Sequence, residues 1–445
     1  MKRRAFLNNS LALSSGLFVL PELIPGSVFR SFRPNDKVNI GLIGCGRIAR
    51  EHNLPEILKY DSARVVAVSD LDSRRMADGK KFIEDSYNAK SGKPGSVNVK
   101  MYRDYRELIA DKSIDAVLIC TPDHWHAQPA VEAALAGKDI YIQKPFTLTI
   151  SEGRILSDTV KKTNVILQVG AQCRSSEPRY RRAAELVRNG RIGRLHTVRI
   201  GMPGDPPGEV VKPQPVPANF DYNTWLGSTP EVFYHEMRVH PQNDYSRPGW
   251  LRNEQFGAGM ITGWGSHFFD YSAWGMDTEL TGPVSVQAVA QFPREGIWNV
   301  HEDFMMKAEY NNGITLYAGT GYPYGVKYEG DKGWIFVTHA GTPKLEAGNP
   351  AVLDSAIKDN EIHLYMTTEH HGNWLDCIRT REQPISTAEM GHRACSLCLI
   401  SHIAMKVPGI LKWSPENEQF TNSDEANSML RREQRAPFGI DNLKL

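Results

Sequence analysis

The chain has 445 residues, of which 41% are hydrophobic and 23% charged, the composition of an ordinary globular protein with room for two domains. The formal net charge is +1, so composition gives no electrostatic case for binding nucleic acid or an anionic membrane. Six cysteines are too few for a disulfide scaffold, and Cys395-x-x-Cys398 has no second pair at zinc spacing, so no metal site is predicted.

The first 33 residues have the pattern of an export signal. Arg3 and Arg4 precede an apolar stretch, residues 11–20, which is too short to span a bilayer. The run Arg-Arg-x-Phe-Leu resembles a twin-arginine signal, which exports proteins already folded; a Sec signal or a signal-anchor is the alternative. No other stretch is long and apolar enough for a membrane helix, so we expect a periplasmic protein without a stable membrane span.

Residues 34–170 alternate strand and helix patterns, which predicts a doubly wound parallel sheet of α/β type. Helical patterns lie between the strands, for example over 151–162, and glycine and proline predict a surface loop over 88–97. The expected strands are continuous apolar runs, as for strands buried on both faces: 38–43, 64–69, 115–120, 139–143 and 165–169.

Residues 171–410 predict a second domain of α+β type with a mostly antiparallel sheet. The stretch 202–217 contains too many prolines for regular structure. Residues 411–445 are expected to form a tail that wraps the surface. Within it, the stretch 423–438 is charged and is expected to be helical at its start. Strands separated by tight turns are expected at 195–200, 284–292, 303–310, 314–320 and 333–338, and helices at 178–189, 370–380 and 388–405.

The first strand runs directly into a Gly-x-Gly-x-x-Ala turn and then into a helix, the order found where a dinucleotide pyrophosphate binds. Gly44 permits the tight turn, Gly46 lets the backbone approach phosphate, and Ala49 lets helix and strand pack closely. With Arg47 and Ile48, this turn is the predicted cofactor-binding element. An ordinary strand–turn–helix is the alternative.

Asp70 follows the second strand, where a carboxylate grips the adenosine ribose in dinucleotide-binding proteins. A carboxylate there accepts a hydrogen bond from the ribose 2′-hydroxyl and repels a 2′-phosphate, so NAD is the expected cofactor. Arg74 and Arg75 are close enough in the chain to soften that preference, which leaves NADP open.

Two further strand ends carry polar residues at the edge where such sheets bind ligands. Lys144 closes the strand 139–143 and is followed by proline; partly buried, it can polarise a substrate hydroxyl or reach the cofactor. A solvated lysine at a loop start is the alternative. His124 and His126 lack further metal ligands, so they are expected to contact the ribose or nicotinamide, together with Thr121 and Pro122.

A glycine-rich run at 257–265 leads into a helix that begins near Ser266 and has His267 at its start. An imidazole there can take a proton from a hydroxyl near neutral pH. Asp270 lies one turn later on the same face. The alternative is that His267 caps a core helix among aromatic residues.

Candidate substrate contacts are residue types that bind sugars, namely aromatic faces for C–H patches and arginines for hydroxyls. Tyr245, Arg247 and Trp250 lie together before the glycine-rich run; a packed surface loop is the alternative. The predicted set is completed by Arg174, Trp264 and Asp270.

Taken together, these features resemble the Gfo/Idh/MocA family, which includes glucose–fructose oxidoreductase and inositol dehydrogenase. The resemblance implies a Rossmann domain, a second domain whose open sheet often forms homo-oligomers, a nicotinamide cofactor and a sugar or polyol substrate. It also implies that Lys144 is the active-site lysine and His267 the active-site histidine. The tail over 425–437 resembles that of exported Bacteroidetes-type members. The similarity extends over residues 36–440 and rests on the glycine turn, Asp70, Thr121-Pro122, Lys144-Pro145 and the Gly-x-His-x-x-Asp run ending at Asp270.

Two positions depart from the family pattern. Gln143 stands where members commonly have glutamate, and Gly263 stands where many have aspartate four residues before the histidine. A Lys–Asp–His relay is therefore incomplete. We expect His267 and Lys144 to carry more of the chemistry, with Asp270 only orienting His267.

The leading hypothesis is an exported NAD-dependent oxidoreductase that acts on a hydroxyl of a sugar, polyol or glycoside. In it, His267 removes the hydroxyl proton and Lys144 holds the oxygen as a carbonyl forms. A second hypothesis is an NAD-dependent glycoside hydrolase that works by oxidation, elimination, hydration and reduction. A third, of another class, is a non-catalytic carbohydrate-binding protein with a vestigial cofactor.

Overall fold

The computed structural model describes residues 36–93, 95, 97–341 and 344–443. The predicted export signal therefore lies outside the described residues. Within those ranges, no helix combines the length and the apolar character needed to cross a membrane.

The first sheet has six parallel strands in the order β3-β2-β1-β4-β5-β6, so the strand order reverses between β1 and β4. This confirms the predicted doubly wound sheet, whose ligand site is expected at that reversal. The short strand β3 was not predicted, because its three residues carry no apolar run. The strands are β1 (Val38–Ile43), β2 (Ala63–Ser69), β3 (Lys100–Tyr102), β4 (Ala116–Ile119), β5 (Asp139–Ile142) and β6 (Leu167–Val169).

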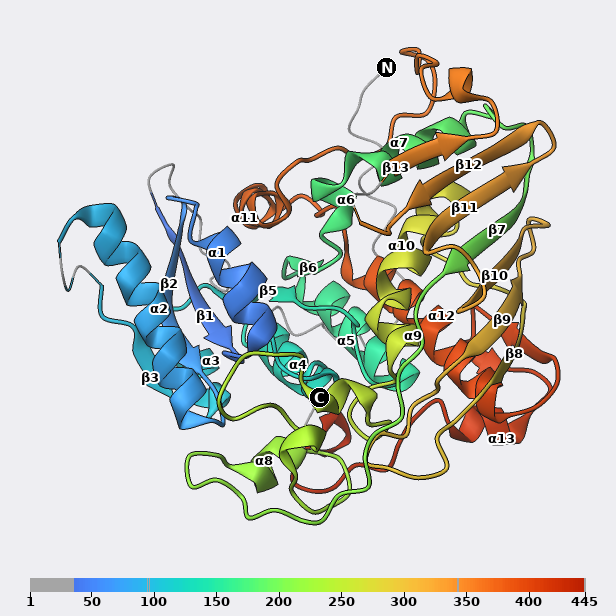
Figure 1. Cartoon of the computed structure of the whole chain (residues 1–445). Helices are drawn as coiled ribbons and strands as arrows, with labels where there is room; N and C mark the ends of the chain where they lie inside the picture. Colours follow the sequence, from blue (N-terminus) through green and yellow to red (C-terminus); the bar gives the residue numbers. More distant parts are fainter. Residues whose placement is uncertain (1–35, 94, 96, 342–343, 444–445) are drawn as a thin grey trace, which may run out of the picture. The chain divides into compact units, whose positions relative to one another are not determined.

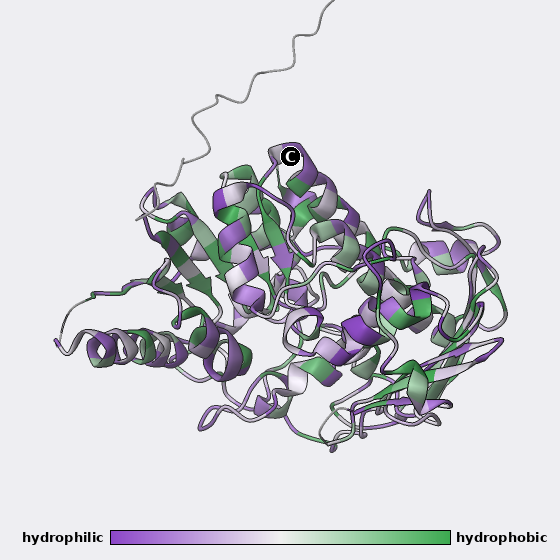
Figure 2. Cartoon of the chain, turned by 90° about the horizontal axis from the view of Figure 1, so that it is seen from above, coloured by the Kyte–Doolittle hydropathy of each residue, from purple (hydrophilic) through white to green (hydrophobic). Residues whose placement is uncertain are grey.

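Helices cover both faces of this sheet (Figure 1), and the apolar strands lie between them (Figure 2). The predicted loop over 88–97 starts later than expected, because one helix continues to Ser91 and ends at Gly92, whose φ is 65°. One face carries the π-helical turn η1 (Ala49–Asn53), α1 (Leu54–Ile57), α2 (Ser73–Ser91) and α11 (His370–Thr380), and the other carries α3 (Tyr105–Ala110), α4 (Ala127–Leu135) and α5 (Ile150–Thr163).

The second sheet has nine strands in the order β13-β12-β11-β7-β10-β9-β8-β14-β15, all antiparallel except the pair β7–β10. The predicted antiparallel sheet is therefore confirmed, with β11 and β13 to β15 as additional strands. Strand β11 escaped prediction because glycine stands at both of its ends. The strands are β7 (Leu195–Gly201), β8 (Ser285–Ala290), β9 (Phe304–Glu309), β10 (Thr315–Gly319), β11 (Gly325–Gly330), β12 (Gly333–Thr338), β13 (Lys344–Ala347), β14 (Leu411–Ser414) and β15 (Gln419–Phe420).

Helices α7 (Pro178–Arg188), α10 (Gly265–Met276) and α12 (Ala388–Lys406) pack on one face of this sheet (Figure 1). Alternate residues on β8 to β12 are half-buried or exposed, so the other face is open. Helix α12 is buried over most of its length and also packs on α5, which joins the two sheets through one core.

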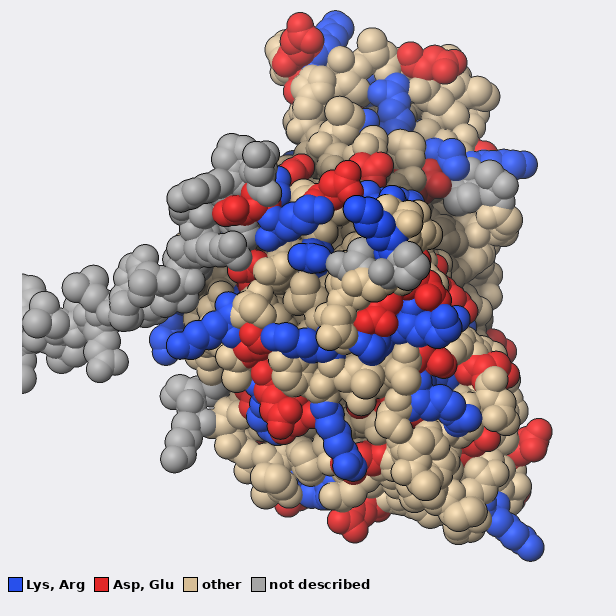
Figure 3. Space-filling model, turned by 90° about the vertical axis from the view of Figure 1, so that its left-hand side faces the viewer, with Lys and Arg blue, Asp and Glu red and all other residues tan. Residues whose placement is uncertain are grey.

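Short helical turns complete the fold, mainly in the segments that connect the two sheets. Figure 3 shows basic and acidic side chains interspersed over one side of the molecule, consistent with the net charge of +1. The short elements are η2 (Asp123–Trp125), α6 (Cys173–Ser176), α8 (Tyr222–Leu226), η3 (Glu236–Arg238), η4 (Gly249–Arg252), α9 (Met260–Gly263), η5 (Pro350–Val352), α13 (Asp424–Ser428) and η6 (Ile440–Asn442).

A charged network ties α5 and α12 to the turn between β14 and β15. Glu418, in that turn, accepts hydrogen bonds from Arg154 at 2.8 Å and pairs with the His392 imidazole at 2.7 Å. Arg154 also binds both oxygens of Glu389 at 2.9 Å. Burial would raise the pKa of Glu418, but its hydrogen bonds with His392 and Arg154 lower that pKa to about 2. Glu418 has a φ of 51°, a left-handed conformation that disfavours a side chain with a Cβ, so the network outweighs local strain.

We predict that Glu418→Gln lowers the free energy of unfolding by about 1–3 kcal/mol at pH 7, because a neutral amide pairs weakly with Arg154. Glutamine has nearly the same shape as glutamate and the same strain at a φ of 51°, so the substitution changes the charge alone. Since the folded-state pKa lies below the usual value, this stabilisation is present above about pH 4.5 and is lost as pH falls towards 2. Urea unfolding of both proteins at pH 7 and pH 3 measures the difference; an equal gap at both pH values would contradict the prediction.

Candidate active site

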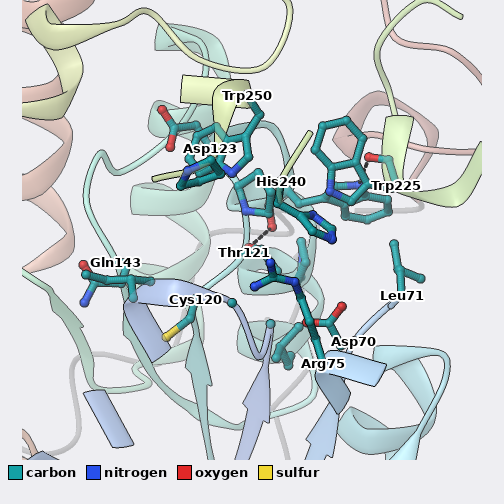
Figure 4. A pocket seen from close by; sticks show the side chains of 18 of the residues that line it. Asp70, Leu71, Arg75, Cys120, Thr121, Asp123, Gln143, Trp225, His240 and Trp250 are labelled. Carbon is teal, nitrogen blue, oxygen red and sulfur yellow. Dashed lines mark hydrogen bonds between the residues drawn. The ribbon is translucent and has the colours of Figure 1, made fainter. Parts of the chain in front are cut away.

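A cavity of about 430 Å³ lies at the carboxyl ends of β1, β2, β4 and β5, where the strand order reverses. Figure 4 shows its two ends: Asp70 and Arg75 lie on one side, and Gln143 and Asp123 on the other. The loop that contains α8 and the segment 246–251 supply further walls, including Trp225. This is the place at which a doubly wound sheet binds its ligand.

The predicted glycine turn forms one wall of the cavity. Gly44 has a φ of 91°, and a Cβ there would lie 2.8 Å from the backbone of Cys120, so the position requires glycine. A Cβ on Gly46, by contrast, would meet no atom within 4 Å and would occupy open space in the cavity. That empty cradle fits a pyrophosphate, which the backbone at Gly46 can approach closely. Arg47 and Ile48 line the cavity beside it.

Asp70 lies next to this turn, as the sequence predicted. Its carboxylate accepts hydrogen bonds from the Cys45 N–H at 2.6 Å and the Asp72 N–H at 2.8 Å. Each oxygen keeps a second acceptor site, so the carboxylate can also accept from ribose hydroxyls. Burial raises the pKa of Asp70. The same carboxylate therefore holds the glycine turn and faces the cavity.

The ribose end of the cavity contains His240, which sequence reasoning missed, and Arg75, which it named only for its possible effect on the preference for NAD. His240 lines the cavity and pairs with Asp72 at 3.1 Å, and Asp72 also caps α2. Arg75 lines the cavity too, while its guanidinium donates to the carbonyls of Pro241 and Asp244. These contacts join residues about 170 positions apart, so no spacing in the sequence indicated them. Arg74 instead binds Gln242 at an exposed position.

Thr121 and Pro122 line the cavity at the end of β4, but the two histidines after them do not. His124 pairs with the Trp225 carbonyl at 2.7 Å. The two ring nitrogens of His126 lie 2.6 and 2.9 Å from the carbonyls of Pro145 and Thr121, and a neutral imidazole donates to one of them. Burial lowers the pKa of His124 to about 3 and that of His126 to about 4. These imidazoles therefore contact backbone carbonyls beside the cavity and do not face the space where the cofactor was predicted to contact them.

Lys144 lines the cavity at the end of β5, in agreement with the prediction. Its ammonium donates a 2.9 Å hydrogen bond to the Gly263 carbonyl of α9, so the lysine connects the two sheet domains. Burial lowers its pKa, and the carboxylate of Asp123 opposes that shift. Gln143 does not contribute to holding the lysine, because its amide donates to Asn53 at 2.9 Å and so fastens η1.

His267 lies on α10 near Lys144, but it does not line the cavity. Burial, with the nearby positive charge of Lys144, holds the pKa of His267 well below its usual range, which keeps the imidazole neutral and able to accept a proton. Its Nδ1 pairs with the Tyr271 hydroxyl at 3.0 Å. Helix α10 begins at Gly265, one position before the predicted start.

Asp270 does not orient His267, contrary to prediction. Its two oxygens accept from Arg174 at 2.6 and 2.8 Å, and both side chains are almost completely buried, at 3% and 1% exposure. Arg174 also pairs with Glu279 at 2.7 Å. Arg174 and Asp270 do not line the cavity, so their buried ion pair joins α6 to α10 and does not contact substrate.

Of the aromatic and arginine candidates, Arg247 and Trp250 line the cavity, and Tyr245 and Trp264 do not. The Tyr245 ring lies between the guanidinium groups of Arg50 and Arg75, at 4.7 and 4.5 Å from its centroid. Trp264 stacks on Phe268 and meets Tyr324 edge-on. Sequence alone could not separate an aromatic face that meets a ligand from one that meets another side chain.

The C-terminal segment fastens the loops around the cavity. Arg435 donates to the carbonyls of Asn223 and Gly227, which lie in and just after α8. Arg432 donates to the Glu254 carbonyl at 2.7 Å, close after the cavity-lining segment. The predicted wrapping tail is thus in contact with the elements that enclose the site.

A doubly wound sheet with a glycine turn, an acidic residue after β2 and a half-buried lysine after β5 defines the class of an NAD-binding oxidoreductase. The chain belongs to the Gfo/Idh/MocA family. Residues 38–171 match the family model described as "Oxidoreductase family, NAD-binding Rossmann fold", and residues 207–440 match the model for its C-terminal alpha/beta domain. The resemblance drawn from the motifs is confirmed, and NAD is the cofactor that the glycine turn accommodates.

Characterised relatives include inositol dehydrogenases. The chain is 32% identical to myo-inositol 2-dehydrogenase of Thermotoga maritima, covering 39% of this chain and 48% of that protein. It is 31% identical to scyllo-inositol 2-dehydrogenase (NAD(+)) of Bacillus subtilis, covering 40% and 48%. The chain thus spans about half the length of the curated relatives it matches.

Solved structures share the fold. The WlbA dehydrogenase of Chromobacterium violaceum, in complex with NADH and UDP-GlcNAcA, matches with a TM-score of 0.61 at 18% identity, over 86% of this chain and 97% of that one. The aldose-aldose oxidoreductase of Caulobacter crescentus matches with a TM-score of 0.59 at 18% identity, over 84% and 99%. At these identities the likeness shows the fold alone.

We predict that Gly44→Ala and Gly46→Ala separate folding from cofactor binding. Alanine at 44 must adopt φ of 91° against the Cys120 backbone, so the free energy of unfolding should fall by about 2 kcal/mol or more. Alanine at 46 meets no protein atom, so stability should be unchanged while NAD affinity falls roughly tenfold, or about 1.4 kcal/mol. Thermal unfolding and calorimetric titration with NAD measure both; unchanged affinity in Gly46→Ala would contradict the placement of the pyrophosphate.

Proposed function

We propose that the protein oxidises a hydroxyl of a sugar, polyol or glycoside with NAD and forms a keto-sugar. The observation that carries this proposal is the half-buried Lys144, whose ammonium is held by the Gly263 carbonyl and which lines the same cavity as the glycine turn and Asp70. Support for the substrate class comes from the relatives, which are named for inositols and, for one from Pseudarthrobacter phenanthrenivorans that is 38% identical over 22% of this chain, for levoglucosan.

Oxidation of an alcohol removes a hydride from the carbon and a proton from the oxygen, so the reaction needs two acceptors. NAD, which the glycine turn and Asp70 would hold, would supply the acceptor for the hydride, that is, for the C–H hydrogen with both electrons. The proton of the hydroxyl leaves to a base, and the carbon–oxygen bond becomes a carbonyl. As the family resemblance implies, we assign the role of proton acceptor to His267, which lies near Lys144 but not among the residues that line the cavity. The Lys144 ammonium has three N–H donors and uses one for the Gly263 carbonyl. It can therefore donate a hydrogen bond to the substrate oxygen.

Substrate contacts fall to residues that line the cavity beside Lys144. Arg47 and Arg247 offer guanidinium donors to hydroxyls, and Trp250 offers an aromatic face to sugar C–H groups. Arg247 is partly buried, and its guanidinium reaches the Met260 sulfur at 3.5 Å, which fixes its position near α9. These three side chains come from two separate loops, so the substrate is expected to lie between them.

We predict that Lys144→Ala lowers the rate of sugar oxidation by about 100-fold or more, since a positioned proton donor contributes 10²–10⁴-fold. NAD binding should persist, because the glycine turn and Asp70 are untouched. Arg74→Ala, at an exposed pair outside the cavity, is the matched control that removes a positive charge without touching the site. Stopped-flow absorbance of the reduced nicotinamide and calorimetric NAD titration measure the two quantities; full oxidation by Lys144→Ala would refute the assignment.

The experiment that tests the function is a panel of inositols, aldoses and aryl glycosides, each incubated with and without added NAD. A keto-sugar together with reduced nicotinamide supports the proposal. Release of aglycone without added NAD would replace it with net hydrolysis through transient oxidation. Sugar binding across the panel with no absorbance change at the nicotinamide would replace it with a carbohydrate-binding role.

We propose further that the twin-arginine signal exports the folded protein with its cofactor, and that copies associate through the open face of the nine-stranded sheet. Tightly held NAD and export of folded cargo support each other, because the dinucleotide is made inside the cell. Native mass spectrometry of a periplasmic extract is expected to show a multiple of the subunit mass with bound dinucleotide. Arg3→Lys/Arg4→Lys should remove the protein from that extract; its continued presence there, or a monomer without nucleotide, would contradict the proposal.

A further inference from the structure

Three half-buried aromatic side chains meet at the start of α10 and have no part in the reaction above. Trp264 lies between α9 and α10, Tyr324 just before β11 and His339 just after β12, and these three residues form the aromatic corner. The His339 N–H donates to the Tyr324 carbonyl at 2.9 Å, so the two are neighbours where β11 and β12 pair. Side chains alternate along a strand, so both lie on the face of the buried Val326 and Val337, which α10 covers (Figure 1).

The fully buried ring of Phe268 is the floor of the aromatic corner. Its centroid lies 5.4 to 5.6 Å from the centroids of all three rings of the corner. Those three rings also meet one another, with centroids 5.0 to 5.5 Å apart and interplanar angles of 65 to 90°. Edge-to-face contacts of this kind are favourable and hold each ring in one orientation. The corner therefore has a fixed shape in the absence of any ligand.

The polar atoms of the corner are not used by the protein itself. In the part of the chain that the structure describes, the Trp264 Nε1, the Tyr324 hydroxyl and the His339 Nε2 have no hydrogen-bond partner, and all three atoms reach the surface. His339 uses its Nδ1 alone, which pairs with the Tyr180 hydroxyl at 3.0 Å. Tyrosine and tryptophan usually find a partner for their polar atom when their rings are packed into a core. The three atoms are therefore available to the hydroxyl groups of a ligand.

The corner adjoins the two side chains to which the reaction is assigned. Gly263, which lines the cavity, accepts the Lys144 hydrogen bond at 2.9 Å, and Trp264 is the next residue in the chain. His267 follows in the first turn of α10, and its ring centroid lies 5.7 Å from that of Trp264. His267 also lies near both Lys144 and His339. A substrate held at Lys144 and His267 therefore has the aromatic corner as its neighbour.

Aromatic rings with free polar atoms match the chemistry of a sugar ring. The C–H groups of a pyranose form an apolar patch that packs on an aromatic ring, and its hydroxyls need hydrogen-bond partners. A purely apolar group would cover the corner and leave its polar atoms without partners, at a cost in free energy. The ring that reacts is held at Lys144 in the cavity, whereas the corner lies outside the cavity lining. The corner is thus free for the next ring of the same molecule.

We propose that the aromatic corner is a subsite for a second sugar ring, so that the preferred substrate is a glycan of two or more rings. The ring that is oxidised lies at Lys144. Its neighbour packs on Trp264, while Tyr324 and His339 form hydrogen bonds with its hydroxyls. This inference deepens the proposed function and rests on it. It also divides the substrates considered above, because inositols and free aldoses have no second ring to place in the corner.

Binding measured without turnover tests the subsite. The full-length protein is loaded with NADH, which cannot accept a hydride, and is titrated calorimetrically with maltose, cellobiose and lactose. Each disaccharide is compared with the methyl glycoside of its non-reducing sugar in the same anomeric form. In at least one of the three pairs, the disaccharide should bind about tenfold more tightly, because the second ring gains aromatic contact and hydrogen bonds. If no disaccharide binds more tightly than its methyl glycoside, the inference is overturned.

Two substitutions locate the second ring. Trp264→Leu removes the largest ring of the corner and should lower disaccharide affinity about tenfold, with methyl glycoside affinity changed less than about twofold. Tyr324→Phe keeps the ring and removes the hydroxyl, and should lower disaccharide affinity about threefold to tenfold. The matched controls Trp334→Leu and Tyr317→Phe, at half-buried positions on the open face of the second sheet, should change neither affinity. An equal loss for both sugars in Trp264→Leu would show damage to the reacting end and would overturn the inference.

Oxidation separates the subsite from the proposed function. With NAD in place of NADH, Trp264→Leu should raise the KM for the disaccharide about tenfold and leave kcat nearly unchanged. A protein that binds the disaccharide at the corner and oxidises no sugar supports the subsite and refutes the proposed function. Oxidation with the same kcat/KM for a disaccharide and its methyl glycoside, in all three pairs, supports the function and overturns the subsite.

Discussion

The hydrogen bond that holds the half-buried Lys144 ammonium is the interaction around which the site is arranged. The lysine closes a strand of the first domain, yet its hydrogen bond goes to the Gly263 carbonyl of the second. An ammonium out of water is stable only where fixed dipoles or charges replace its solvation. The two domains must therefore meet at this point, and α12, packed against both α5 and the second sheet, holds them there.

The two halves of the cavity are built in different ways. Most of the cofactor half depends on short-range structure, because the glycine turn, Asp70 and the start of α2 lie within 31 consecutive positions, from 44 to 74, and His240 joins them from a distant loop. The substrate half is assembled from strand ends, α9 and two long loops that meet only in the folded chain. This division explains why motifs in the sequence predicted the cofactor half and did not predict the substrate half.

The same division determines which parts of the fold and the site could be predicted from the sequence. Apolar runs and glycine spacing predicted five strands of the first sheet, the turn at Gly44 and Gly46, and the placement of Lys144. They did not reveal that Arg174 and Asp270, 96 positions apart, form a buried pair, or that Tyr245 lies between two arginines. Residue type shows that a side chain can bind a sugar, but only the fold shows whether another side chain has already taken its place.

The contacts of Arg432 and Arg435 with the loops around the cavity have a kinetic meaning. If the loops around the cavity must open for a ligand to leave, the detachment of the C-terminal segment would set a lower limit on the residence time of that ligand.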